Sequence, residues 1–318
     1  MTGPATRHYL LASDFDQTLS FNDSGLVLSD LIGATGFEEK VRGLADSNLV
    51  QQGAELAYLI RHDPEYRGVR REHLVETGRR VRLKHDLPAL VEFLGREVSD
   101  CRFSFYVISA APREIVESAL AGIVAPENIL ATEFDWDPES GEVRWVRRVA
   151  AGYGKVKAIE ELETRLGTDP SRTIYVGDGS SDVHVMLHVN RRSGFTIAAS
   201  ENRMLEGIAT RTVVSDNAMG IAVPVLEQIV GSNPDEIRGV FRSFQLTLQQ
   251  CACLPPAWWE PRESCDPECV SSRPVVASRP TGRWGRWPLP PAFACCPCLC
   301  LLPVPRPCLL CAGSRPFP

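Results

Sequence analysis

The stretch HYLLASDFDQT, residues 8–18, joins a short apolar run to two closely spaced carboxylates. Residues 9–15 are rich in apolar and aromatic side chains, which predicts a buried β-strand. Alternation along a strand points Asp14 and Asp16 to the same side, so that two carboxylates meet at its carboxyl end. Open α/β sheets bind their ligands at that edge. The stretch therefore predicts the first strand of an α/β protein, with an acidic site at its end.

Short apolar runs recur along the chain, and each is followed by a stretch with helical spacing. We expect further strands at residues 103–109, 173–177, 195–198 and 212–214. We expect helices at residues 112–121, 155–166, 182–189, 202–208 and 221–230. Strands that alternate with helices favour a parallel sheet covered by helices on both faces. The predicted fold class is α/β, with a doubly wound parallel sheet.

Residues 21–100 interrupt this alternation. The segment is rich in arginine and has helical spacing without a clear strand, so we expect a helical cap domain inserted after the first strand. Its predicted helices are residues 23–32, 49–60, 73–83 and 87–94. A second interruption, residues 133–148, has a Pro-Glu-Ser-Gly turn between alternating runs and predicts a β-hairpin. The expected catalytic core comprises residues 1–20 and 101–250.

The last 68 residues, 251–318, differ in composition from the rest of the chain. They hold 10 of the 11 cysteines, 15 of the 24 prolines and 4 of the 6 tryptophans, and they contain no lysine. Proline at this density opposes regular elements, so we expect this tail to be disordered. The cysteines at 295–300 and 308–311 could suggest metal binding, but their spacing does not repeat as a regular pair of knuckles.

Charge and cysteine usage narrow the classes of partner and compartment. The first 250 residues carry 27 basic and 36 acidic side chains, a net charge of −9, which argues against binding to nucleic acid or to anionic membranes. We find no signal-peptide pattern and no apolar run of about 18 residues, so we expect neither secretion nor a membrane span. Cys101 alone precedes the tail, which excludes a disulfide framework there and suits a reducing, cytoplasmic setting. The oligomeric state stays open.

A second acidic loop, GDGSSD at residues 177–182, follows the third predicted strand. Its glycines allow tight turning and close approach of the backbone to a ligand. Asp178 and Asp182 then join Asp14 and Asp16 at one edge of the sheet. Four carboxylates offer only hard oxygen ligands, which suits Mg²⁺ together with a substrate phosphate. Mg²⁺ is the cofactor that this pattern implies.

Two other segments offer groups that bind anions. The second predicted strand ends in SAAP, residues 109–112, where the hydroxyl of Ser109 and free backbone N–H groups near Ala110 precede a helix. Lys155 opens another predicted helix and offers a cation, with Lys157 as a rival. Phosphoryl transfer depends on such donors and cations, because positioning and electrostatics supply nearly all of its catalysis.

These motifs occur in a recognisable order. DFDQT at residues 14–18, then Ser109, then Lys155, then GDGSSD at residues 177–182 resemble the four motifs of the haloacid dehalogenase-like hydrolase superfamily. The resemblance spans residues 8–230. The insertion after the first motif and the hairpin before Lys155 make the chain most similar to the phosphoserine-phosphatase-like branch. The resemblance implies a Mg²⁺-dependent phosphatase that hydrolyses a small phosphorylated metabolite through a phospho-aspartyl intermediate.

The resemblance also implies roles for the residues that react. Asp14 would be the nucleophile, and Asp16 the general acid and base. Ser109 would donate a hydrogen bond to a phosphoryl oxygen, beside the backbone N–H of Ala110. Lys155 would neutralise charge on the nucleophile and the phosphate.

The same resemblance implies the metal ligands. Asp178 would bind Mg²⁺ directly, together with Asp14 and the backbone carbonyl of Asp16. Asp182 would hold the water shell of the metal or Lys155. Gln17 stands where many members of the superfamily have glycine.

Other interpretations remain beside this one. The same intermediate would serve a phosphotransferase, and a receiver-like signalling module also combines acids, a hydroxyl and a lysine. His184 and His188 have a spacing that zinc sites use, but no third ligand is evident. The cap arginines could bind a second anionic group of a substrate. A solvated helix face explains most of them better, because acids are interleaved with them.

Overall fold

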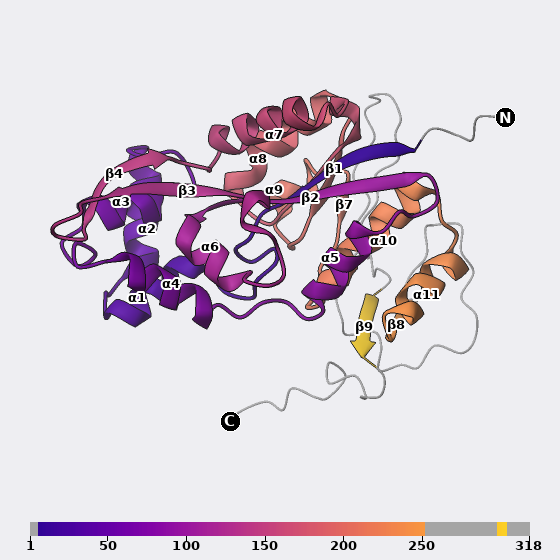
Figure 1. Ribbon diagram of the computed structural model, residues 1–318, viewed down its shortest axis with the longest axis horizontal. Helices are drawn as coiled ribbons and strands as arrows, with labels where there is room; N and C mark the ends of the chain where they lie inside the picture. The colour runs from indigo at the N-terminus through magenta and orange to yellow at the C-terminus, as the bar shows by residue number, and fades with distance from the viewer. Residues whose placement is uncertain (1–5, 252–297, 304–318) are drawn as a thin grey trace, which may run out of the picture.

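A computed structural model describes residues 6–251 and 298–303 of the chain (Figure 1). The strands of its main sheet are β1 (Arg7–Ser13), β2 (Cys101–Pro112), β3 (Ile129–Trp136), β4 (Val143–Arg148), β5 (Thr173–Gly177), β6 (Phe195–Ala198) and β7 (Arg211–Thr212). Their order across the sheet is β4-β3-β2-β1-β5-β6-β7. All neighbours are parallel except β3 and β4, which are antiparallel. The predicted α/β class and parallel sheet are confirmed.

Helices cover both faces of this sheet. The core helices are α5 (Leu87–Gly95), α6 (Arg113–Ala119), α7 (Tyr153–Leu166), α8 (Val183–Arg191), α9 (Arg203–Glu206), α10 (Ala222–Val225) and α11 (Pro234–Ser243). Helices α7 and α8 lie on one face, and α5, α6 and α10 lie on the other (Figure 1). Successive side chains of β1 point to opposite faces of the sheet: Leu10 packs with α7 and α8, and Leu11 packs on the other face.

Short helical turns complete the core. They are the 3₁₀ turns η1 (Pro126–Asn128), η2 (Pro170–Arg172), η3 (Ser180–Asp182) and η4 (Ala218–Ile221), and the π-helical turn η5 (Leu226–Val230). The last predicted helix, residues 221–230, is therefore divided between η4, α10 and η5. Helix α11 has no counterpart among the predicted helices.

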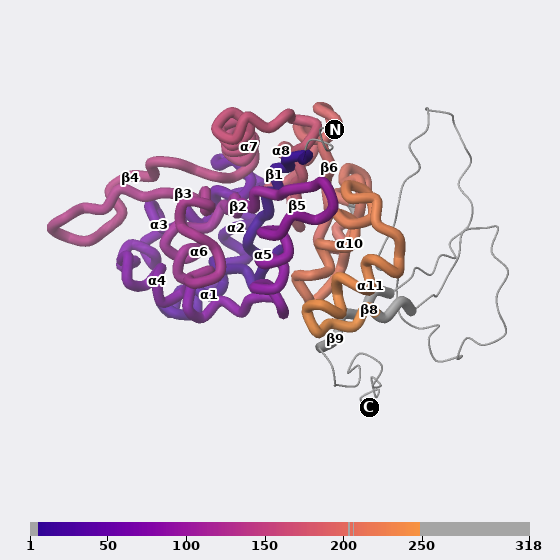
Figure 2. The backbone as a smooth tube through the Cα atoms, turned by 45° about the vertical axis from the view of Figure 1, so that its right-hand side comes forward, coloured from indigo at the N-terminus to yellow at the C-terminus, as the bar shows by residue number. Residues whose placement is uncertain are grey.

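Four helices between β1 and β2 form the cap. They are α1 (Ser24–Ile32), α2 (Phe37–Ser47), α3 (Glu55–His62) and α4 (Arg71–Arg80). One buried apolar core runs from the sheet into the cap and joins Leu28 of α1, Leu74 of α4 and Ile115 of α6. Helix α2 is absent from the predicted helices, although Phe37, Val41 and Ala45 form an apolar stripe along it; none of its residues is fully buried. Figure 2 shows the β3–β4 hairpin reaching out beside the cap helices.

The boundaries of two strands correct the sequence analysis. Strand β1 ends at Ser13, so Asp14 and Asp16 lie in the loop after the strand rather than on it. Strand β2 continues to Pro112, with a shift of register between Ser109 and Pro112. Helix α6 therefore begins one residue after the proline, which occupies the N-cap position.

The hairpin and helix α5 also refine the predicted organisation. The antiparallel pairing of β3 and β4 confirms the hairpin. Strand β3 begins at Ile129, however, and also pairs with β2 in parallel, so it extends the main sheet. Helix α5 falls in the segment expected to be cap, but it packs against β2 and η4 of the core.

The tail is described only in part. Strand β8 (Leu246–Cys251) pairs antiparallel with β9 (Cys298–Pro303). The prediction that proline excludes regular elements is thus wrong for Cys298–Pro303. The cysteines at 295–296 and 308–311 lie outside the described residues. Across the described residues, no helix is both long and apolar enough to span a membrane.

Helix α4 of the cap meets helix α6 of the core at Gly78. A Cβ atom at Gly78 would lie 2.3 Å from the carbonyl oxygen of Ile115 and 2.7 Å from the Cβ of Ser118. The hydroxyl of Ser118 also donates to the carbonyl of Val75 at 2.7 Å. The glycine therefore permits the close approach that joins the cap to the core.

We expect Gly78→Ala to lower the free energy of unfolding by about 1–3 kcal/mol, because the added methyl group forces α4 away from α6. Urea denaturation measures this change. Gly43→Ala in α2 is the control, since a Cβ there has no atom within 4 Å. That alanine should be neutral or stabilise by up to about 1 kcal/mol. Equal destabilisation by both variants would contradict the packing.

Candidate active site

Two neighbouring strands bring the acidic loops together. Asp14 follows β1 and Asp178 follows β5, and these strands pair in parallel. The backbone N–H of Asp14 donates to the carbonyl of Val176 at 2.8 Å, which extends the pairing into the loop. The carboxyl ends of both strands therefore deliver acids to one edge of the sheet, as the sequence predicts.

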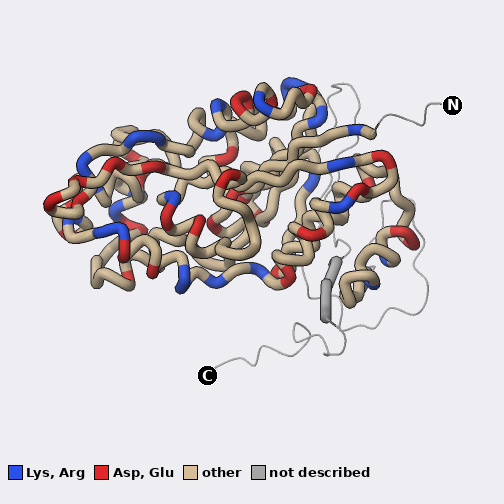
Figure 3. The backbone as a smooth tube through the Cα atoms, in the orientation of Figure 1, with Lys and Arg blue, Asp and Glu red and all other residues tan. Residues whose placement is uncertain are grey.

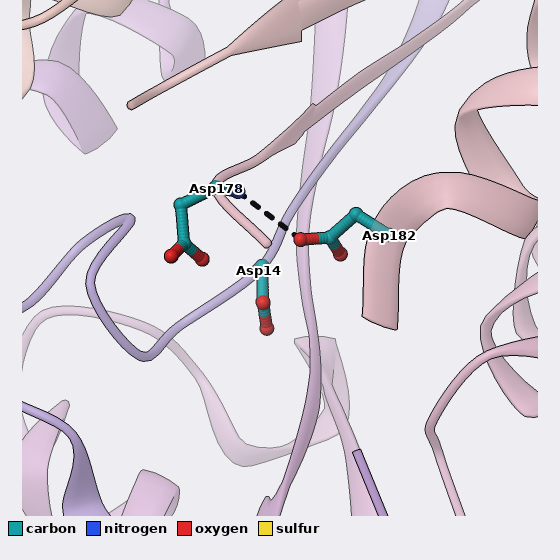
Figure 4. Close-up of side chains that lie close together, drawn as sticks. All are labelled: Asp14, Asp178 and Asp182. Atoms are coloured by element: carbon teal, nitrogen blue, oxygen red, sulfur yellow. Dashed lines mark hydrogen bonds between the residues drawn. The ribbon is translucent and has the colours of Figure 1, made fainter. Parts of the chain in front are cut away.

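Asp14, Asp178 and Asp182 form one carboxylate cluster (Figure 4). One carboxylate oxygen from each lies within 4.8 Å of the others. Lys155, at the start of α7, is fully buried beside them. Its Nζ lies 2.9 Å from Oδ2 of Asp14 and 2.7 Å from Oδ1 of Asp182. Lys157 is exposed, so Lys155 is the lysine of the site.

The carboxylate of Asp182 is held by four donors. Its Oδ1 accepts from Lys155 and from the hydroxyl of Tyr175 at 2.6 Å. Its Oδ2 accepts from the backbone N–H groups of Asp178 and Gly179, both at 3.1 Å. Gly177 makes room for this arrangement, because a Cβ there would lie 2.4 Å from Cγ of Asp182. Asp182 thus orients the lysine and shapes the acidic loop.

Asp16 does not join the carboxylate cluster. Its two oxygens accept from the N–H and the hydroxyl of Ser24, at 3.0 Å and 2.8 Å. The expectation of four carboxylates around one ion is therefore corrected to three, with the side chain of Asp16 turned toward the start of α1. Asp16 still lines the same cavity as Asp14.

The segment after β2 reaches the same cavity. Ser109 is fully buried and lines it with Ala110 and Ala111. The N–H of Ala111 donates to Oγ of Ser109 at 3.1 Å. We expected free backbone N–H groups in this segment, and for Ala111 that prediction is wrong. The carbonyl of Ala110 accepts from the hydroxyl of Thr132 at 2.7 Å, which fixes the turn.

Burial and mutual repulsion shift the titration of the cluster. Burial, then the charge of Asp182, raises the pKa of Asp14 well above its usual range, despite Lys155. The same two causes raise the pKa of Asp178 to about 7. Burial lowers the pKa of Lys155, but Asp14 and Asp182 outweigh it and the net pKa rises. Burial and the charge of Asp23 raise the pKa of Asp16 to about 8.

This cluster fits a divalent cation. Three carboxylates converge, and Lys155 contacts two of them while Lys84 acts on Asp178 from a greater distance. A divalent cation among them would relieve the repulsion that raises the pKa values of Asp14 and Asp178. All donors are hard oxygens, which Mg²⁺ prefers. The oxygens of Asp182 are already taken by four donors, so Asp14 and Asp178 are better placed to bind an ion directly.

A cavity of about 510 Å³ lies between the cluster and the cap. From the core, Asp14, Ser109 and Asp178 line it. From the cap, one face of α2 lines it. A loop of the cap closes tightly on the core at Gly53, where φ is +88° and a Cβ would lie 2.9 Å from Cβ of Ser181. The cavity has room for a small molecule that touches both the acids and the cap.

The other candidates from the sequence lie elsewhere. The ring of His184 stacks on Tyr153 with centroids 4.4 Å apart, and His188 lies 3.8 Å from Glu160. Neither histidine belongs to a metal-type cluster among the described residues. Basic and acidic residues alternate along the cap rather than gathering in one stretch (Figure 3).

Three residues of the site were given no role there from the sequence. Tyr175 lies within β5, where the sequence predicts a residue of the hydrophobic core, yet its hydroxyl donates to Asp182. Thr18 donates to Oδ1 of Asp178 at 3.2 Å. Gln17 has a φ of +56°, a region that favours glycine, and it lines the cavity. The departure from glycine at this position, visible in the sequence, was a signal for the last of these.

The family of the chain follows from comparison with known proteins. The model of the haloacid dehalogenase-like hydrolase family matches residues 11–187, which is more than half of the chain. The chain belongs to the haloacid dehalogenase-like hydrolases. No curated protein sequence matches it.

Solved structures share the fold of this haloacid dehalogenase-like hydrolase. A substrate-bound phosphoserine phosphatase aligns with a TM-score of 0.55 and 16% identity, over 68% of this chain and 97% of the other. A phosphoserine phosphohydrolase-like protein from Francisella tularensis gives 0.53 and 17%, over 67% and 98%. A HAD family hydrolase from Salmonella enterica gives 0.53 and 16%, over 64% and 66%. At these identities the likeness shows the fold, which is phosphoserine-phosphatase-like.

We expect Tyr175→Phe to lower the free energy of unfolding by about 1.5–3 kcal/mol, because it removes a hydrogen bond to the buried charge of Asp182. Urea denaturation measures this loss. Tyr106→Phe is the matched control, since the hydroxyl of Tyr106 has no hydrogen-bond partner within the described residues. If both variants unfold like the parent protein, the tyrosine does not hold Asp182.

Proposed function

We propose that the protein is a Mg²⁺-dependent phosphatase that hydrolyses a small phosphorylated metabolite through a phospho-aspartyl intermediate. One observation carries the proposal: the buried carboxylate of Asp14 lines a small cavity and lies 2.9 Å from the Lys155 ammonium. A carboxylate can attack phosphorus there while the cation offsets charge that builds on the phosphoryl oxygens. Membership of the haloacid dehalogenase-like hydrolases supports the same chemistry.

In the first half-reaction, a carboxylate oxygen of Asp14 attacks the phosphorus atom of the ester. The bond from phosphorus to the alcohol oxygen breaks, and the phosphoryl group is transferred to Asp14. Asp16 donates a proton to the departing alkoxide, which leaves as a neutral alcohol. Its position is fixed by the two hydrogen bonds from Ser24.

In the second half-reaction, Asp16 accepts a proton from a water molecule. The water oxygen attacks phosphorus, the bond to Asp14 breaks, and inorganic phosphate leaves. These steps return Asp14 to a carboxylate and Asp16 to its protonated form. If an alcohol replaced water as the acceptor, the same residues would catalyse phosphotransfer, which is the alternative activity on this site.

The remaining residues bind and orient the phosphoryl group. Ser109 and the backbone of Ala110 line the cavity where its oxygens would lie, and Lys155 balances its charge. Asp14 and Asp178 would hold Mg²⁺ with the backbone carbonyl of Asp16, while Asp182 positions Lys155. The bound ion supplies positive charge for the phosphoryl oxygens.

The cap supports a metabolite as the substrate rather than a protein. Residues of the cap and the core line the cavity together, and its volume of about 510 Å³ suits a small molecule. A receiver-like module would have no need of such a cavity. The lone buried Cys101 of the catalytic part agrees with the cytoplasmic setting that we propose.

We expect Asp14→Asn to reduce phosphate release from p-nitrophenyl phosphate by at least about 10³-fold, because the amide cannot form the intermediate. Removal of divalent ions by a chelator should abolish turnover, and added Mg²⁺ should restore it. The control is Asp46→Asn, an exposed acid of α2, which should keep full activity. Undiminished turnover by Asp14→Asn would exclude the proposed nucleophile.

A further inference from the structure

The cap wall of the cavity has a distinctive chemistry. Its apolar part is formed by one face of α2 and the start of α3, with the side chains Phe37, Val41, Ala45 and Leu56. The rest of this wall consists of Asp23, Gln52, Gly53 and Glu55, so its only charged groups are two carboxylates. No lysine or arginine lines the cavity in the described part of the chain. The part of a substrate that faces the cap therefore meets two carboxylates, one amide and hydrocarbon.

Glu55 is a buried carboxylate without a cationic partner. It is only 7% exposed, although it lines the cavity at the first turn of α3. Its Oε2 accepts the backbone N–H of Gly53 at 2.7 Å, the one donor from another described residue. Burial raises the pKa of Glu55, and the charge of Asp23 adds to the rise. A cation that enters the cavity would stabilise the ionised form of this buried, unpaired carboxylate.

Asp23 offers a second carboxylate to the same space. Its Oδ1 caps α1 by accepting the N–H groups of Gly25 and Leu26, at 2.7 Å and 3.3 Å. Its Oδ2 has no hydrogen bond to a described residue and remains available to a ligand. Burial raises the pKa of Asp23, as it does for Glu55. Two acids that repel each other across one cavity wall form a site that favours a positive charge.

Three arginines of the cap make contacts away from the cavity, and no cap arginine lines it among the described residues. Arg70 pairs with Glu142 at 3.2 Å, and Arg71 lies 3.6 Å from Glu114. Arg61 donates to the carbonyl of Arg144 at 3.1 Å. These contacts lie toward the β3–β4 hairpin and α6, so the cap arginines do not provide the anion site that the sequence left open. A carboxylate on the substrate alcohol would meet like charges and no counter-ion.

We propose that the substrate is a phosphomonoester whose alcohol carries an ammonium group and no carboxylate. This inference rests on the proposed phosphatase function and adds the class of substrate. The phosphate lies at the carboxylate cluster, where Lys155 and the metal supply positive charge. The ammonium lies at Asp23 and Glu55, and the carbon chain between them packs along the apolar face of α2.

Three esters test this proposal, because they differ by one group each. O-phosphoethanolamine has the ammonium, O-phosphoserine adds a carboxylate to it, and n-propyl phosphate replaces the ammonium with a methyl group. With the full-length protein and Mg²⁺, we expect kcat/KM for O-phosphoethanolamine to exceed both others by about tenfold or more. Equal or faster hydrolysis of O-phosphoserine would overturn the proposal.

Two variants assign the selectivity to the acids. Glu55→Gln keeps an acceptor for Gly53, and Asp23→Asn keeps a good N-cap for α1, so both should fold. We expect each to lower the ratio of kcat/KM for O-phosphoethanolamine to that for n-propyl phosphate by about fivefold or more. Asp30→Asn, an exposed acid of the same helix α1, should leave the ratio unchanged. An unchanged ratio in both acid variants would show that the acids do not read the ammonium.

These outcomes separate the substrate class from the function. If the protein hydrolyses all three esters at equal rates, and Asp14→Asn abolishes every rate, the ammonium proposal fails while the phosphatase function stands. If none of the esters nor p-nitrophenyl phosphate is hydrolysed with Mg²⁺ present, the proposed function fails and the inference fails with it.

Discussion

The buried ion pairs of Lys155 hold this site together. Its ammonium lies between Asp14 and Asp182 without contact with solvent, and it links the loop after β1, the start of α7 and the turn η3. Burial of these charges is costly unless each is paired and hydrogen-bonded. Tyr175 and two backbone N–H groups satisfy the remaining oxygens of Asp182. These contacts offset the free-energy cost of burying the charges, and they hold Asp14 where it lines the cavity.

The two ends of the cavity favour ligand groups of opposite charge. At the core end, an unbalanced carboxylate cluster calls for a divalent cation, and the cation in turn favours a phosphate. At the cap end, Asp23 and Glu55 lack a counter-ion within the described residues. A ligand that is anionic at one end and cationic at the other meets both demands. The fold is shared with phosphoserine phosphatases, but fold alone does not set the substrate, because the cap wall is built from this chain's own residues.

Much of this site could be predicted because it is encoded by motifs close to strand ends. Asp14, Lys155 and Asp178 stand where short motifs meet the carboxyl edge of the sheet. Other features of the site depend on tertiary contacts, which the spacing of apolar residues along the sequence does not predict. The hydroxyl of Tyr175 acts across the sheet edge, and Asp16 turns to Ser24 because β1 ends one residue before Asp14. Helix α2 lines the cavity with Phe37, Val41 and Ala45, which recur at helical spacing in the sequence, so this missed helix could have been predicted.

The most direct test follows the phosphoryl group itself. The full-length protein with Mg²⁺ and a hydrolysed phosphomonoester is quenched with acid before the steady state, and peptide mass spectrometry then locates any covalent phosphoryl group. We predict that the group appears on Asp14 as the first equivalent of alcohol is released. Phosphoryl found on a different side chain would contradict it. Alcohol and phosphate released together while residue 14 stays unmodified would contradict it as well.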